Sequence, residues 1–215
     1  MAIRRWMTPD GTFRILAANS TEMVRAALEK SKPTSEVADA YGRLLTGGAL
    51  LQLATAPVDR MQFQLMHTGF AGDLLADVWP GPHVRGRIEY PRPEGEPAIS
   101  DAGILQVSRR PGHGGDLYTG SVAIDDTNVG AALQTYMMES EQTLTLLTLV
   151  TVMDGESVVR AGGMIVQALP GAKHEHLEDV TLCLEQADYS DLVRAGEDPR
   201  DAAASLFHRM GVHHL

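Results

Sequence analysis

The side chains best suited to chemistry in this sequence are the histidines near its C-terminus. His174 and His176 form a His-x-His pair, and His208, His213 and His214 stand within the last eight residues. Imidazole is a common metal ligand, but a metal site requires ligands that converge on one point. Two histidines separated by one residue do not share a helical face. We interpret these histidines as solvated surface residues and expect no metal site.

Cys183 is the only cysteine, and it lies in the segment VTLCLEQ. A reactive thiolate needs an electropositive setting, whereas the nearest charges here are Glu178 and Glu185. We interpret Cys183 as a small buried or boundary thiol. A single cysteine also excludes an intrachain disulfide, an all-cysteine zinc site and a two-thiol redox switch within this chain.

Glycine-rich strings occur at Gly47-Gly48, Gly112 to Gly115 and Gly162-Gly163. None has the spacing of a phosphate-binding or dinucleotide-binding loop, and no G-x-S-x-G motif is present. Gly112 to Gly115 reads as a hairpin turn, and Gly162-Gly163 as a bulge or close approach inside a strand. Ser140 stands between two glutamates, which would repel an oxyanion, so we assign it to hydrogen bonding at a helix end. We expect no catalytic residue, no cofactor and no enzymatic activity.

Ten methionines are a further unusual feature of the sequence. The thioether side chain is flexible and polarizable, which suits a surface that must accommodate many partners. A candidate substrate-contact surface comprises Met66, Met137, Met138 and Met164. The alternative role for these methionines is filling the core.

The composition describes a globular chain of 215 residues and 23.2 kDa, enough for one large domain or two small ones. Lys and Arg total 18 against 28 Asp and Glu, a net charge of −10. This balance argues against nucleic acid or an anionic membrane as the main partner, because neutralising phosphates needs clustered cations. No apolar run approaches 18 residues, and the start MAIRRWMTPDG has no secretory core. We therefore expect a soluble cytoplasmic protein.

Two helices are predicted in the first quarter of the chain. Asn19, Ser20 and Thr21 are cap residues before EMVRAALEK, and a second helix begins with Ser35 as its cap. The second helix has one apolar stripe, formed by Val37, Tyr41, Leu44, Leu45 and Leu51. Its glycines at 42, 47 and 48 cost about 1 kcal/mol each relative to Ala. We expect them to permit close packing of a deeply buried helix.

From Arg60 onward the apolar residues alternate with polar ones, as in half-buried strands. The predicted strands, after an earlier one at TFRILA, are RMQFQLMH, LLADVW, HVRGRIEY, GILQVSRR, LYTGSVAI, TLTLLTLVTVM and VVRAGGMIVQAL. Thr127 or Asn128 caps a helix that lies between the strands LYTGSVAI and TLTLLTLVTVM. Asp154-Gly155 makes a tight turn between the last two strands. The sequence predicts an α+β fold in which helices pack on a largely antiparallel sheet.

The chain changes character after Pro170. Residues 171–215 carry four basic and nine acidic residues, half of the net charge. Leu177, Val180 and Leu184 mark a short amphipathic helix, and Asp198 with Pro199 begins another that ends near Met210 and Gly211. We divide the chain into a core domain, residues 1–170, and an acidic, helical, linker-like segment, residues 171–215.

Three sequence blocks give the chain a recognisable pattern. They are Tyr118-Thr119-Gly120-Ser121-Val122, the run YMMESEQ from Tyr136 to Gln142, and AGGMIVQALPG from Ala161 to Gly171. Weaker matches are Val84-Arg85-Gly86 and the helical AYGRLLTGGALLQLAT. With these blocks in order, the chain resembles the heat-shock protein 33 family of redox-regulated bacterial holdase chaperones over roughly residues 10 to 210.

The resemblance implies a cytoplasmic, ATP-independent stress chaperone that binds unfolded or aggregation-prone proteins and often dimerises. It implies an α+β core, a helical linker and a small zinc domain whose four thiolates follow a C-x-C…C-x-x-C pattern. This chain has none of those cysteines and stops after LFHRMGVHHL, near the end of the linker. Two explanations stay open, a fragment of a longer protein or a natural core-only member.

Zinc release on thiolate oxidation would unfold such a metal-dependent domain. With one cysteine, we expect neither structural zinc nor thiol-disulfide activation in this chain. Our first hypothesis is a holdase whose apolar or Met-rich patch is either open or covered by residues 171–215. The second is a non-chaperone dimeric interaction or regulatory module on the same fold, and the third is a histidine-carboxylate metalloenzyme.

Overall fold

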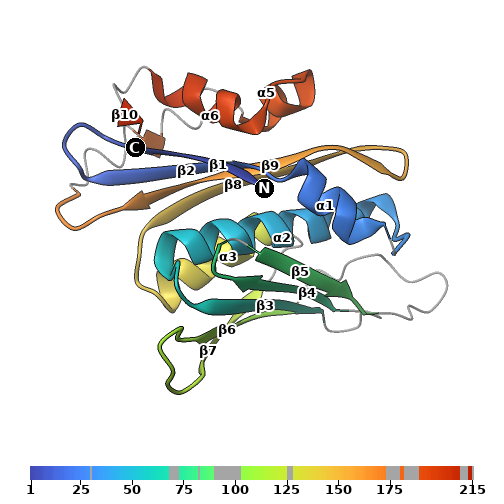
Figure 1. Ribbon diagram of the computed structural model, residues 1–215, viewed down its shortest axis with the longest axis horizontal. Helices are drawn as coiled ribbons and strands as arrows, with labels where there is room; N and C mark the ends of the chain where they lie inside the picture. The colour runs from blue at the N-terminus through green and yellow to red at the C-terminus, as the bar shows by residue number, and fades with distance from the viewer. Residues whose placement is uncertain are drawn as a thin grey trace.

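The computed structural model describes residues 1–29, 31–67, 73–81, 83–89, 103–124, 128–172, 180–181, 189–208 and 213–214. These residues form two antiparallel five-stranded sheets and a set of helices. Figure 1 shows the resulting layers, from the two C-terminal helices through the first sheet and a central helical layer to the second sheet. The α+β fold and the antiparallel strands predicted from the sequence are confirmed.

The first sheet, here called sheet A, has the strand order β10-β1-β2-β9-β8. Its strands are β1 (Ala2–Met7), β2 (Phe13–Asn19), β8 (Thr145–Asp154), β9 (Ser157–Ala168) and β10 (His213–His214). The predicted turn at Asp154-Gly155 joins β8 to β9, with Gly155 at φ +59°. Strand β1 was not predicted, because its adjacent arginines interrupt the apolar alternation. Pairing with β2 and β10 makes it a strand.

The second sheet, sheet B, has the order β5-β4-β3-β6-β7. Its strands are β3 (Arg60–His67), β4 (Leu74–Trp79), β5 (His83–Ile88), β6 (Gly103–Arg110) and β7 (Tyr118–Ile124). The predicted alternation is confirmed in β3, where Met61, Phe63 and Leu65 are buried. The division into two sheets was not predicted, because alternation identifies the two faces of a strand and not its neighbours.

Three helices lie between the sheets: α1 (Thr21–Leu28), α2 (Ser35–Thr55) and α3 (Val129–Glu139). The predicted close packing of α2 is confirmed at two glycines. A Cβ on Gly47 would lie 2.4 Å from Leu133 Cδ1, and one on Gly48 would lie 2.8 Å from Phe63 Cδ2. Leu133 belongs to α3 and Phe63 to β3, so the absence of these side chains brings α2 against both neighbours.

The helix caps agree in part with the sequence. Asn128 caps α3, since its Oδ1 accepts from the backbone N–H groups of Gly130 (3.0 Å) and Ala131 (3.3 Å). Thr34, not Ser35, is the N-cap residue of α2, and Ser35 is already helical. No helix within the described part of the chain combines the length and apolar character needed to cross a lipid bilayer.

Helices α5 (Tyr189–Ala195) and α6 (Pro199–Phe207) lie on the face of sheet A that points away from α2 (Figure 1). The predicted start of α6 is confirmed, and the described helix extends to Phe207; its predicted end near Met210 and Gly211 lies outside the described residues. Of the helix predicted around Leu177, Val180 and Leu184, only Val180 lies among the described residues, and it is buried.

Candidate functional site

Sheet A is apolar on both of its faces. Seven consecutive residues of β9, from Ala161 to Gln167, are buried. Ile165 packs in the core around α2, whereas its neighbours Met164 and Val166 pack on the opposite face. A strand with both faces buried has a continuous apolar run instead of an alternating one. The sheet therefore needs a cover on each side.

The face that points away from α2 is covered by the C-terminal helices and is here called the outer face of sheet A. The strands contribute one set of buried apolar side chains: Trp6, Phe13, Ile15, Ala17, Val150, Met164 and Val166. The C-terminal segment contributes the other: Val180, Tyr189, Val193, Ala202, Ala203, Leu206 and Phe207. Burial of one large apolar side chain contributes roughly 1.5–3 kcal/mol. Contact with these helices thus provides much of the stability of this layer.

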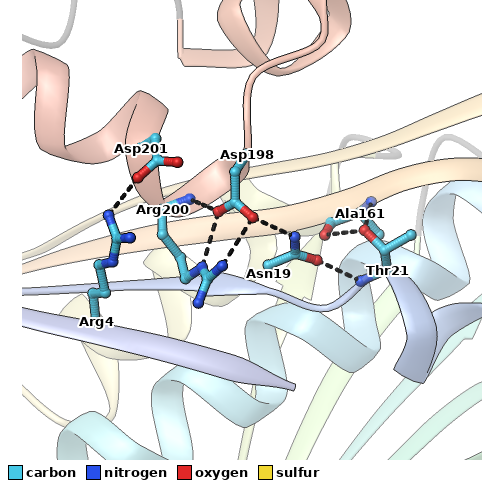
Figure 2. A network of polar contacts seen from close by, with 7 residues as sticks. All are labelled: Arg4, Asn19, Thr21, Ala161, Asp198, Arg200 and Asp201. Atoms are coloured by element: carbon cyan, nitrogen blue, oxygen red, sulfur yellow. Dashed lines mark hydrogen bonds and ion pairs between the residues drawn. The ribbon is translucent and has the colours of Figure 1, made fainter.

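A polar cluster joins α6 to the end of β2, and we call it the Asp198 junction (Figure 2). The Asp198 carboxylate caps α6 by accepting from the backbone N–H of Arg200 at 2.8 Å. It also accepts from Arg200 Nε and Nη2, and from Asn19 Nδ2 at 2.8 Å. The Arg200 hydrogen bonds, followed by those from Asn19, hold the pKa of Asp198 well below its usual range. The carboxylate is therefore charged at neutral pH.

Asn19 extends the junction to α1. Its Oδ1 accepts from the backbone N–H of Thr21, and the Thr21 hydroxyl bridges to the backbone of Ala161 in β9 (Figure 2). The arrangement links the end of β2 and the interior of β9 to the first residues of α1 and α6. A second ion pair, between Arg4 and Asp201, is partly exposed and adds little, as is usual for surface pairs.

Pro199, the first residue of α6, rests directly on a glycine of the sheet. A Cβ on Gly162 would lie 2.4 Å from Pro199 Cβ and 2.6 Å from the carbonyl oxygen of Ala18. The interpretation of Gly162-Gly163 as a close approach inside a strand is therefore confirmed. The adjacent Gly163 faces the other side, where Leu149 Cδ2 would be 2.6 Å from its Cβ.

One buried group opposes this packing. The hydroxyl of Tyr189, at the start of α5, is buried without a hydrogen-bond partner in the described part of the chain. Burial raises the pKa of this hydroxyl, with a smaller contribution from the charge of Asp198. An unsatisfied buried polar group costs roughly 1–3 kcal/mol. The packing of α5 thus carries a free-energy cost, which would be removed if the Tyr189 hydroxyl were exposed to water.

The four methionines predicted to form a contact surface are not together. Met137 is buried in the core around α2, and Met164 is buried under α5 and α6. Met138 is 50% exposed on α3, and Met66 is half-buried on β3, opposite Ile104. Only Met164 belongs to the outer face of sheet A. The signal that could have located this face is the continuous apolar run of β9, which requires cover on both sides.

Among the described residues, the remaining candidates do not form a catalytic or metal-binding arrangement. Ser140 is the C-cap of α3, and its backbone N–H donates to the Tyr136 carbonyl at 2.9 Å. His208 is exposed after α6, and no group of three metal-ligating side chains occurs among the described residues. Cys183, His174 and His176 lie outside the described residues, as do the side chains of His213 and His214.

Two of the sequence blocks meet at a polar hollow of about 540 Å³ between β7 and the end of α3. There the Tyr136 hydroxyl donates to Glu141 Oε1 at 2.8 Å, and burial together with this bond raises the pKa of Tyr136. A Cβ on Gly120 would lie 3.1 Å from the Tyr136 ring and 3.2 Å from Ser140 Oγ. These residues hold β7 against α3, and we assign them this structural role.

Comparison with known proteins places these observations in context. The family model described as Hsp33 protein matches residues 2–215. The 33 kDa chaperonin of Shouchella clausii is 30% identical, with 96% of this chain aligned to 74% of the relative. The 33 kDa chaperonin of Desulforamulus reducens is 31% identical, with coverage of 92% and 70%. The crystal structure of a 33 kDa chaperonin from Thermotoga maritima has the same fold, with a TM-score of 0.80 at 21% identity over 96% of this chain and 74% of that one.

The contact between Gly162 and Pro199 predicts a variant that releases the C-terminal helices selectively. Gly162→Ala should weaken the packing of α5 and α6 by about 1–3 kcal/mol, because the added methyl overlaps a rigid ring and a backbone oxygen. Hydrogen exchange should become faster in α5 and α6 before it does in the rest of the chain. Gly163→Ala, which points toward α2, is the matched control and should lower global stability without this selectivity. Equal patterns in both variants would contradict the assignment.

The Asp198 junction predicts a specific pH dependence. The folded pKa of Asp198 is lowered, so its stabilising effect is complete above the unfolded value of about 3.9 and is lost as the pH falls through the folded value. Asp198→Asn keeps a capping side chain but loses the charge, and should cost about 1 kcal/mol at pH 7. Urea unfolding should show this difference shrinking below about pH 4. A difference that stays constant down to pH 2 would refute the role of the charge.

Proposed function

This chain belongs to the Hsp33 protein family, and on that premise we propose that it is an ATP-independent holdase that binds unfolded proteins. The observation that carries the proposal is the outer face of sheet A, where a continuous apolar surface lies beneath two short helices. We further propose that the protein acts in the cytoplasm without enzymatic activity, and that it forms a homodimer.

Holding an unfolded chain requires apolar surface that becomes accessible to it. The strands of sheet A supply two large aromatic side chains, Trp6 and Phe13, next to the branched residues Ile15 and Val166. Exposed apolar areas of more than a few hundred Å² are typical of interaction sites. Binding the unfolded client and not its native state lowers the concentration of free unfolded chain and so limits aggregation.

The C-terminal segment is suited to uncovering this surface reversibly. Helices α5 and α6 have seven and nine residues, too few to be stable alone in water. Their position depends on the apolar contacts and the Asp198 junction, against the cost of the buried Tyr189 hydroxyl. Residues 171–215 carry a net charge of −5, which would keep the open form soluble. We propose that this segment covers the client surface and restrains activity.

The control of activity in this chain is proposed to be independent of thiol chemistry. The sequence contains Cys183 alone, which is insufficient for a disulfide or a four-thiolate zinc site. We therefore propose that this chain needs no zinc or other cofactor and that opening of the C-terminal segment does not require oxidation.

The proposed function predicts that the protein suppresses aggregation of a heat-unfolded client to the same extent under reducing and oxidising conditions. Light scattering of the client with increasing amounts of protein measures this directly, and Cys183→Ser is the matched control. Activity that appears only after oxidation would contradict thiol-independent control. No suppression under either condition would favour the dimeric interaction or regulatory module.

Covering of the client surface predicts that deletion of the residues after Gly171 raises activity. The shortened chain should suppress aggregation at a lower molar ratio and bind more of an apolar dye, because Trp6 and Phe13 become exposed. Gly162→Ala should give an intermediate effect in the full chain, which keeps the test valid if the shortened chain does not fold. Unchanged or lower activity in both variants would contradict the proposal.

A further inference from the structure

The outer face of sheet B, which points away from α2 and α3, has no helix over it in the described part of the chain (Figure 1). The strand register places four arginines on this face: Arg60, Arg85, Arg87 and Arg110. Two of them are paired with carboxylates, Arg60 with Asp77 and Arg87 with Glu89, so among the described residues Arg85 and Arg110 are the cations of this face without an ion pair.

Two of these arginines stand directly opposite each other on neighbouring strands. Arg60 of β3 pairs in register with Arg110 of β6, so both side chains leave the sheet on the same side. Like charges in this arrangement are destabilising. The pairing of the two arginines therefore does not itself stabilise the sheet.

The two arginines differ in their partners. Arg60 donates from Nε and Nη2 to the two carboxylate oxygens of Asp77, at 2.8 and 2.5 Å, and its guanidinium lies 4.6 Å from the ring centre of Trp79. These contacts fix its orientation. Arg110 is exposed and makes no hydrogen bond or ion pair with any described residue. Its charge is therefore available to a ligand.

A hollow of about 190 Å³ lies between these side chains. It is lined by Arg60, Gln62, Ser108, Arg110 and Leu117, so each of the four polar side chains can donate hydrogen bonds and none is acidic. At about 30 Å³ per water molecule, the space suits an anion of several heavy atoms and not a large organic ligand.

We propose that this hollow binds a phosphoryl group, as inorganic phosphate or as the phosphate of a small monoester. Guanidinium groups match phosphate oxygens in charge and in geometry. Donors that approach from two strands suit a tetrahedral dianion better than a planar carboxylate, which presents only two oxygens. Because Asp77 already offsets the charge of Arg60, a bound dianion would chiefly neutralise Arg110. This site is separate from the outer face of sheet A and does not depend on the holdase proposal.

The test measures binding to the full chain at constant ionic strength, with inorganic phosphate as the first probe and phosphoserine as the second. Calorimetric titration and thermal unfolding should show saturable binding and a rising Tm. Arg110→Gln should bind phosphate at least about tenfold more weakly, since the positive charge is lost and a neutral amide replaces the charged donor. Without phosphate the same variant should be at least as stable as the original chain, because the like-charge pair is gone.

Arg87→Gln is the matched control, since Arg87 lies on the same face, is paired with Glu89 and does not line the hollow. It should bind phosphate as the unaltered chain does. Equal loss in Arg87→Gln and Arg110→Gln would show diffuse attraction and overturn the site. Unchanged binding by Arg110→Gln, or an equal rise in Tm with acetate, would overturn it as well. Tighter binding of phosphoserine than of phosphate would identify the monoester as the preferred form of the ligand.

Discussion

The structure depends on one constraint, which is that sheet A is apolar on both faces and cannot leave either one in water. The central strands β2 and β9 have buried residues on both sides, and the sheet therefore requires two covers. Helices α2 and α3 cover one face of sheet A and connect this sheet to sheet B. Helices α5 and α6, which follow β9 in the chain, cover the opposite face of sheet A.

The two covers of sheet A differ in length and in the contacts that hold them. Helix α2 has 21 residues and is buried between two sheets, with glycines that bring it against Leu133 and Phe63. The C-terminal helices are short, lie on one sheet only and depend on a charged junction at Asp198. The less stable parts of a protein open first, and they are commonly the parts that take part in binding. The apolar surface under α5 and α6 is therefore the one that local opening would expose first.

Charge is distributed on a finer scale than the net value of −10 suggests. The acidic excess is concentrated in residues 171–215, whereas the outer face of sheet B carries four arginines. The net charge argues against nucleic acid or an anionic membrane as the main partner, but it is an average over the whole chain and does not locate the charges. The pairing of β3 with β6 brings Arg60 beside Arg110, although fifty residues separate them in sequence.

Local patterns in the sequence by themselves determined the α+β class, the alternating strands, the close packing at Gly47 and Gly48, and the cap of α6 at Asp198. Each depends on residues near one another in the chain, where side-chain periodicity and capping act. Only the tertiary structure decided which strands share a sheet, and that Met137 and Met164 fill separate cores instead of one surface. The contact of Pro199 with Gly162 and the pairing of Arg60 with Arg110 were settled in the same way. These contacts join residues far apart in sequence. They form because apolar faces are buried against each other, and no local sequence pattern shows which faces will meet.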